Sequence, residues 1–327
     1  MALALEVKIT FNRVVRIVHF VWGLLVMCCI VGCGGRSAPP PATSSAEVAS
    51  SAGRFGVLLM AHGGPPEWNE AVLESVKPLK AKYDVEVAFG MADAASLQES
   101  VQKLEARNVR KIGVVRLFVS GESFFQETEQ IFGLRDGAPA ANGQHPIHTG
   151  HPGHSMAFFR LKANASFALS AEGLADAPEM GQILADRAAA LSKAPAREDV
   201  LILAHGPGDD AENTRWIAKL DARAAVVRTR APYRRVQVET LREDWPDKRV
   251  AAEKRIRAFV ERASAEGGKA IVLPFRVQGF GPYKSVLEGL EYTADGAGLI
   301  PHSEVTKWIE RQAITLEHGA FRAPLGS

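Results

Sequence analysis

An internal repeat in the sequence limits the architectures that this chain can adopt. Residues 55–65 read FGVLLMAHGGP, and residues 199–208 read DVLILAHGPG. Each is an unbroken apolar run that ends in Ala-His-Gly, and this pattern is typical of a strand buried on both faces of a parallel sheet. The two runs place His62 and His205 at equivalent positions. We therefore expect two similar halves, each built around one buried strand.

A second pair of similar segments supports the same architecture. Residues 111–125 (KIGVVRLFVSGESFF) and 269–283 (KAIVLPFRVQGFGPY) are apolar strands that run into glycine and then an aromatic residue. Alternation of such strands with helical patterns indicates βαβ units and a parallel sheet. The predicted fold class is α/β, with two tandem domains, each a small parallel sheet flanked by helices. The expected helices cover 70–83, 94–107, 178–192, 213–223 and 250–267.

The repeat also predicts the domain limits. We expect domain 1 at 54–196 and domain 2 at 197–318, with a loose tail at 319–327. The first half carries an insertion at 136–159, and the extra residues of the second half lie around 229–247, a stretch rich in arginine.

Residues 1–32 have the pattern of a lipoprotein signal peptide. An apolar run ends in Ile30-Val31-Gly32-Cys33, which is similar to a bacterial lipobox. The resemblance implies lipidation of Cys33, and the Gly-, Ser-, Ala- and Pro-rich residues 33–53 predict a flexible linker. We expect a lipid-anchored protein on the periplasmic side, and Gly34 favours the outer membrane. The alternatives are an uncleaved membrane anchor and an ordinary signal peptide with a chance cysteine.

Charge and cysteine content exclude several functional classes. The chain has 39 basic and 37 acidic residues, and residues 1–32 hold three of the basic and one of the acidic, which leaves 36 of each sign. A neutral body does not favour nucleic-acid binding. All three cysteines lie between positions 28 and 33, so the body has no disulfide, cysteine nucleophile or cysteine metal ligand.

His62 and His205 are the leading candidates for site residues. A histidine directly after a buried parallel strand stands at the carboxyl edge of the sheet, where open α/β folds bind ligands. Neutral imidazole binds Co²⁺, Ni²⁺, Fe²⁺ and Zn²⁺, and it can accept a proton. The alternative for each histidine is a side chain hydrogen-bonded into a turn.

These features resemble the class II tetrapyrrole chelatases, which include sirohydrochlorin cobaltochelatases and ferrochelatases. The resemblance rests on the two Ala-His-Gly strands, the strands that run into glycine-rich turns, and Ala-Leu-Ser at 168–170 followed by Asp186-Arg187. It implies insertion of a divalent metal (cobalt, iron or nickel) into a tetrapyrrole such as sirohydrochlorin, without an organic cofactor. By this resemblance His62 and His205 would be the metal ligands and catalytic residues. The oligomeric state is not indicated.

One turn departs from this family, which has a second histidine there. The turn reads SGESFF at 120–125 and QGFGPY at 278–283. Glu122, Glu127 or Glu129 would replace the histidine in the first half, and Glu288 or Glu291 in the second. Either carboxylates have rebuilt the metal site or catalysis has been lost. The alternative function is therefore a non-catalytic periplasmic lipoprotein that binds metal or tetrapyrrole.

Further candidates come from a histidine-rich segment and from arginines. The segment QHPIHTGHPGHS contains prolines and glycines that exclude a regular helix, so we expect a flexible loop that captures metal or covers a macrocycle, or else one that binds nothing specific. Arg116 and Arg276 are predicted to pair with substrate carboxylates, against the alternative of solvated surface arginines. The histidines of the segment are His145, His148, His151 and His154. Arg228, Arg230, Arg234 and Arg235, placed after the second strand of domain 2, are further arginine candidates.

An α/β hydrolase is the rival fold. Residues 60–65 (MAHGGP) are similar to its His-Gly-Gly turn. That fold requires G-x-S-x-G around its nucleophile, and the nearest match, GESFF at 121–125, lacks the closing glycine. The sequence therefore disfavours a hydrolase.

Overall fold

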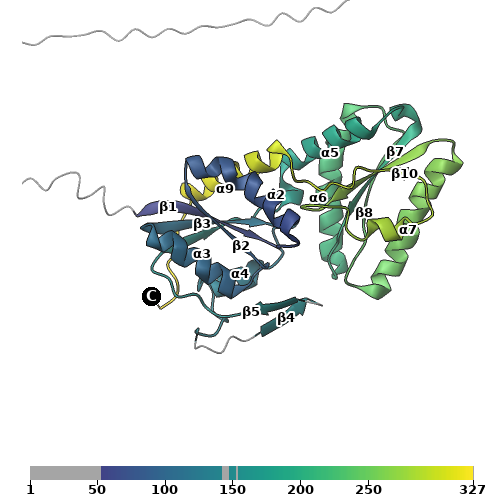
Figure 1. Cartoon of the computed structure of the whole chain (residues 1–327). Coiled ribbons are helices and arrows are strands. Elements are labelled where there is room, and N and C mark those ends of the chain that lie inside the picture. The colour runs from purple at the N-terminus through teal and green to yellow at the C-terminus, as the bar shows by residue number, and fades with distance from the viewer. Residues whose placement is uncertain (1–52, 142–146, 152–153, 327) are drawn as a thin grey trace, which may run out of the picture. The chain divides into compact units, whose positions relative to one another are not determined.

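Two parallel four-stranded sheets form the framework (Figure 1). The computed structural model describes residues 53–141, 147–151 and 154–326, with only the backbone described for 147–151, 154 and 155. The signal peptide, Cys33 and the linker up to residue 52 lie outside the described residues. Within the part that is described, no helix combines the length and apolar character needed to cross a membrane.

The first sheet has the order β2-β1-β3-β6. Val57 through Ala61 of β1 are fully buried, because α3 covers one face of the sheet while α2 and α9 cover the other. This explains why the strand reads as a continuous apolar run. The strands are β1 (Arg54–Ala61), β2 (Asp84–Phe89), β3 (Val109–Leu117) and β6 (Ser166–Leu169). The helices of this half include α2 (Pro66–Val76), η1 (Lys77–Ala81), α3 (Ala94–Ala106) and α4 (Phe125–Ile131).

The second sheet repeats this plan with the order β10-β9-β7-β8. Its central strand β7 is buried along its whole length, between α7 on one face and α5 and α6 on the other. The predicted α/β fold with two sheets is thus confirmed. The strands are β7 (Glu198–Ala204), β8 (Arg235–Thr240), β9 (Lys269–Phe275) and β10 (Tyr292–Thr293). The helices are η2 (Leu174–Asp176), α5 (Pro178–Leu191), η3 (Pro195–Arg197), α6 (Asp210–Arg230), α7 (Pro246–Ala265), α8 (Tyr283–Val286) and α9 (Ser303–Glu317).

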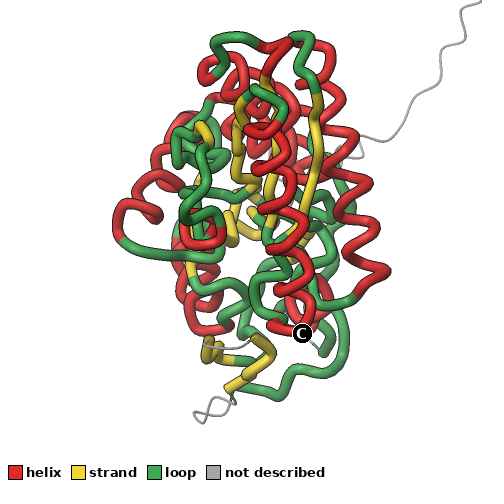
Figure 2. Tube along the Cα trace, turned by 90° about the vertical axis from the view of Figure 1, so that its right-hand side faces the viewer, coloured by secondary structure: helices red, strands yellow, loops and turns green. Residues whose placement is uncertain are grey.

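The hydrophobic core joins the two halves. Leu59 of β1 and Ile202 of β7 point into one shared cluster, which α5, α6 and α9 complete. Their neighbours Leu58 and Leu201 point to the opposite faces and pack into separate clusters. Because side chains alternate along each strand, one face of each sheet packs into the core shared by both halves, and the other face packs into a core of its own half. In Figure 2 the helices lie on either side of the strands.

The C-terminal segment returns to the first sheet. Helix α9 lies within the predicted domain 2, yet it packs against β3, α2 and α5. Residues 319–326 of the segment 319–327, expected to be a loose tail, are instead docked on the first half. The Phe321 ring lies 6.0 Å from that of Phe55, and Arg322 pairs with Phe167 of the edge strand β6. The Phe321 ring and the backbone pairing with the edge strand β6 together hold the segment. The domain limits 54–196 and 197–318 stay a prediction.

The histidine-rich insertion is not the loop that the sequence predicts. Its backbone forms an antiparallel hairpin of β4 (Ile147–His151) and β5 (His154–Ala157), separate from both sheets (Figure 1). Prolines and glycines exclude a helix, but an edge strand tolerates them, and this is why the pattern fits a hairpin as well as a loop.

Candidate functional site

A cleft of about 990 Å³ lies where the strands of both sheets end. Its walls come from the residues directly after β1, β3, β7, β8 and β9, together with one face of α6. His62 and His205, the two repeat histidines, both line it. The carboxyl edges of parallel strands are the expected location for a ligand site in such sheets.

His205 has two acceptors on its ring nitrogens. Nδ1 lies 2.8 Å from the carbonyl oxygen of Gly206, and Nε2 lies 3.0 Å from Oδ2 of Asp244. Oε2 of Glu243 is 3.9 Å from the same Nε2. Because a carbonyl and a carboxylate can only accept, both nitrogens serve as donors, which favours the imidazolium form.

The electrostatic surroundings of His205 act in the same direction. Burial alone would lower its pKa, but the hydrogen bond to Asp244 and the charge of Glu243 outweigh burial and raise the pKa. The imidazole therefore holds a proton more firmly than an exposed histidine does. A divalent cation arriving between the imidazole and the carboxylates would have to displace that proton.

His62 occupies the equivalent place in a different environment. Its Nδ1 lies 2.7 Å from the carbonyl oxygen of Gly63, as in the second half, and its ring is exposed. Its ring neighbour is Trp68 at 6.4 Å, and the loop after β2 brings Met91 into the cleft lining. The corresponding loop after β8 brings Glu243 and Asp244. The repeat has thus kept the histidine and changed its partners.

Glu243 is held from the other side by Arg276. The two form a short ion pair, and the guanidinium lies 5.8 Å above the ring of Tyr283. Arg276 does line the cleft, as predicted, but its charge is directed at Glu243. Only 10% of the Glu243 side chain is exposed, so this carboxylate depends on its cation.

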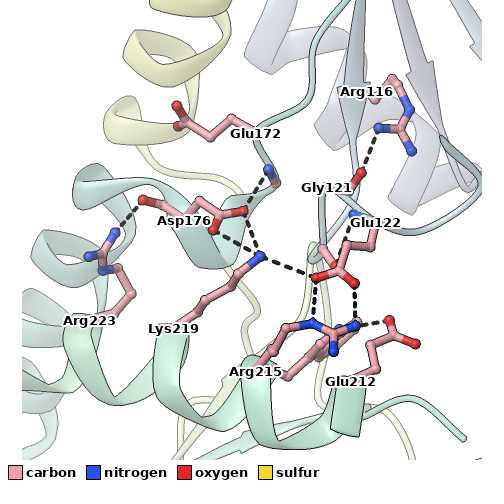
Figure 3. Close-up of polar contacts among 12 residues, drawn as sticks. Arg116, Gly121, Glu122, Glu172, Asp176, Glu212, Arg215, Lys219 and Arg223 are labelled. Atoms are coloured by element: carbon pink, nitrogen blue, oxygen red, sulfur yellow. Dashed lines mark hydrogen bonds and ion pairs between the residues drawn. The ribbon is translucent and has the colours of Figure 1, made fainter. Parts of the chain in front are cut away.

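Glu122 lines the opposite wall and reaches across to α6 (Figure 3). Arg215 binds its carboxylate with two nitrogens at 2.6 and 3.2 Å, and Lys219 lies 3.6 Å away. The hydrogen bond from Arg215 lowers the pKa of Glu122. This predicted metal ligand is therefore present at the cleft as a carboxylate already paired with cations.

Arg116 is wrong as a substrate-binding residue. It is 1% exposed, and its guanidinium donates to the carbonyl oxygens of Gly121, Ser123 and Ser170. Burial lowers the pKa of Arg116 to about 10. The side chain points inward on β3 and fixes the turn that carries Glu122, which is its contribution to the cleft (Figure 3).

The remaining predicted residues are not brought together at the cleft. Glu288 is exposed outside the cleft lining, and its backbone oxygen accepts from Arg257. Arg234 lies directly before β8 and Arg235 is its first residue. Both bind Asp199, at the edge of the sheet opposite the cleft, so their predicted place after the second strand is wrong. His145 lies outside the described residues, as do the side chains of His148, His151 and His154. Among the described side chains, including those that line the cleft, no group of three His, Cys, Asp or Glu is placed to hold a metal ion.

Sequence reasoning missed Glu243 and Asp244. They lie three and four residues after the short strand β8, whose sequence RVQVET mixes polar and apolar residues and gives a weak signal beside the apolar repeats. Knowing that β8 lies next to β7 would have placed them beside His205, since neighbouring parallel strands end at one edge.

Comparisons with known proteins bear on the fold. No family model matches the chain, and no curated protein sequence matches it. Among solved structures, SirB from Bacillus subtilis with Fe³⁺ has a TM-score of 0.57 and 12% identity, over 82% of this chain and 98% of that one. The sirohydrochlorin chelatase SirB from Bacillus subtilis subspecies spizizenii with cobalt has a TM-score of 0.51 and 9% identity, over 80% and 95%.

The chain has a chelatase-like fold. A third structure, DR2241 from Deinococcus radiodurans, is a multidomain protein described as structurally similar to chelatases, with two additional domains. It has a TM-score of 0.51 and 18% identity over 80% of this chain, which spans 55% of its length. At sequence identities this low, the similarity to chelatases extends to the fold alone. The chemistry of the cleft depends on the residues that line it in this protein.

Proposed function

We propose that this chelatase-like protein inserts a divalent metal ion into a tetrapyrrole, with His205 at the reaction centre. The observation that carries the proposal is the 3.0 Å approach of His205 Nε2 to Asp244 Oδ2 within the cleft. Imidazole and carboxylate are ligands suited to cobalt, iron or nickel, which would be substrates here.

The chemistry requires a proton acceptor as well as a metal ligand. When a divalent cation enters a free-base tetrapyrrole, two pyrrole N–H bonds break, metal–nitrogen bonds form and two protons leave. His205 in its neutral form can accept one proton at Nε2. Asp244 and Glu243 then stabilise the resulting imidazolium, which is the same interaction that raises its pKa. The other proton would pass to water through the exposed side of the cleft.

Aromatic rings around the cleft suit a flat macrocycle. Trp68 lies beside His62, and Trp245 lies edge-on to His205 with ring centres 6.0 Å apart. Phe118 and Phe124, whose ring centres are 5.6 Å apart, also line the cleft. Such rings offer offset stacking and apolar contact to a planar ligand.

A non-catalytic binder is the second candidate, and a specific observation favours it. Both carboxylates near His205 already have partners, Glu243 in Arg276 and Asp244 in His205 itself. A site that must break these pairs would hold a metal weakly, as a carrier does. In either case we propose that the protein is lipid-anchored through Cys33 on the periplasmic side.

Metal insertion tests the choice between these two functions. The full chain is incubated with Co²⁺ and either sirohydrochlorin or mesoporphyrin IX, and the absorbance change is followed. We expect one macrocycle to be metallated faster than in the absence of protein, and His205→Ala to remove the acceleration. His318→Ala, a histidine at the end of α9 outside the cleft lining, is the control. Binding without acceleration would favour the carrier, and no binding would reject both.

A further inference from the structure

We infer that the cleft selects against polyanionic ligands, so that its macrocycle carries few carboxylates. That the ligand is a macrocycle rests on the proposed function. That the macrocycle carries few carboxylates rests on the charges of the cleft. The expected substrate is one whose carboxylates can stay in solvent when its ring is inside the cleft.

Carboxylates outnumber cations among the described charged residues that line the cleft. The cations are Lys219 and Arg276, so the formal charge of this lining is −3 when both histidines are neutral and −2 when His205 is protonated. The five carboxylates are Glu122, Glu127, Glu212, Glu243 and Asp244.

Both cations are already engaged by protein carboxylates. Arg276 is paired with Glu243, whose side chain is 10% exposed. Lys219 lies 3.1 Å from Asp176 and 3.6 Å from Glu122, between two acidic groups (Figure 3). The charge of each cation is therefore already offset by protein carboxylates before a ligand arrives.

Breaking the Arg276 pair would be unfavourable, because it leaves a buried carboxylate without its cation. Arg215, at the rim, is likewise bound to Glu122 by two hydrogen bonds. Glu212 accepts from Trp216 Nε1 at 3.2 Å and interacts with the charge of Arg215, which it shares with Glu122. A ligand carboxylate inside the cleft would thus meet more carboxylates than cations, and the cations are already paired.

The positions of the carboxylates on the ligand then decide whether it can enter the cleft without repulsion. A macrocycle with two carboxylates on one edge can enter with its apolar edge first and leave both groups in solvent. A macrocycle with eight, distributed around its whole rim, must bring several of them between the walls. Because the cleft is open to solvent, repulsion between its carboxylates and those on the rim of a ligand is screened more at high salt than at low salt.

A charge series of porphyrins tests the inference. Binding of mesoporphyrin IX, coproporphyrin III and uroporphyrin III, with two, four and eight carboxylates, is measured on the full chain by tryptophan fluorescence quenching. At 0.05 M NaCl we expect affinity to fall along the series, by about tenfold or more between its ends. At 0.5 M NaCl, uroporphyrin binding should strengthen while mesoporphyrin binding changes little.

Two double variants separate charge from the hydrophobicity of the porphyrins. Glu127→Gln with Glu212→Gln should strengthen uroporphyrin binding severalfold. Glu99→Gln with Glu261→Gln, an equal charge change on the exposed surfaces of α3 and α7, should not.

Three outcomes would count against the inference in distinguishable ways. Uroporphyrin bound as tightly as mesoporphyrin would overturn the inference alone. An order that salt and the cleft variants leave unchanged would also overturn it, because hydrophobicity would then explain the order. Binding of none of the three porphyrins would overturn the proposed function and this inference together.

Discussion

His205 and Asp244 come from the ends of neighbouring strands and approach within 3.0 Å, Nε2 to Oδ2. The loop that carries Asp244 is fixed by His205 itself, whose carbonyl oxygen accepts from the backbone N–H of Arg242 at 2.7 Å. The equivalent loop in the first half also bonds to its histidine, through Gly90 N–H and His62 O at 3.0 Å. The same backbone arrangement thus presents carboxylates in one half and Met91 in the other.

This asymmetry predicts unequal contributions to metal binding. We expect His205→Ala to weaken Co²⁺ binding by about tenfold or more, equivalent to about 1.4 kcal/mol, because it removes the imidazole that faces two carboxylates. His62→Ala should weaken it less, and the double variant should abolish tight binding. Isothermal titration calorimetry measures all three, with His318→Ala as the control. Equal effects of the two single variants would contradict a centre at His205.

The raised pKa of His205 predicts how Co²⁺ binding depends on pH. A protonated imidazole cannot bind metal, so Co²⁺ affinity should increase as pH rises through the pKa of His205, above roughly 6.5. In the metal-free protein, Asp244→Asn removes the acceptor and should move the NMR titration midpoint of His205 to lower pH. The His205–Asp244 pair contributes stability that is present below roughly pH 6.5 and lost as pH rises through the raised pKa. An unchanged midpoint in Asp244→Asn would exclude this coupling.

Replacement of Arg116 tests its role in holding the cleft turn. Arg116→Met retains much of the volume but leaves three carbonyl oxygens without this donor, so we expect a loss of about 3 kcal/mol in the free energy of unfolding. Urea denaturation followed by circular dichroism measures it. Arg110→Met, at an exposed position on the same strand, should change stability by under about 0.5 kcal/mol. Similar losses of stability in both variants would show that the hydrogen bonds of the buried Arg116 guanidinium do not stabilise the fold.

Asp199 predicts sensitivity of the fold to acid. It is fully buried and binds Arg234 and Arg235; burial alone would raise its pKa, but the hydrogen bonds from these arginines outweigh burial and lower it. Its contribution is therefore present above roughly pH 3.9 and lost as pH falls through the lowered pKa.

The variant Asp199→Asn should cost about 3 kcal/mol at pH 7, because two arginines lose a buried partner. Denaturation midpoints of variant and wild type should converge as the pH is lowered below about 4. Asp221→Asn, which removes an exposed partner of Arg228, is the control and should change stability by under about 1 kcal/mol. A pH-independent difference between Asp199→Asn and wild type would show that charge is not the cause.

Local sequence patterns are sufficient to predict the α/β class, the two sheets and the positions of His62 and His205 at strand ends. These follow from local pattern, since a strand buried on both faces must be apolar throughout and must end where glycine turns the chain. The sequence also indicated Glu122 and Arg276, which do line the cleft.

The contacts that these residues make depend on how the strands pair in the folded protein. Arg116 and Arg276 occur in similar sequence contexts. In the folded protein Arg116 is buried and binds the carbonyl oxygen of Gly121, whereas Arg276 binds Glu243 in the cleft. This difference depends on the register of each strand. The carboxylates beside His205 lie about 40 residues away along the chain and become its neighbours only because β7 and β8 pair in parallel. Ion pairs between distant segments depend on folding geometry, which no local pattern in the sequence encodes.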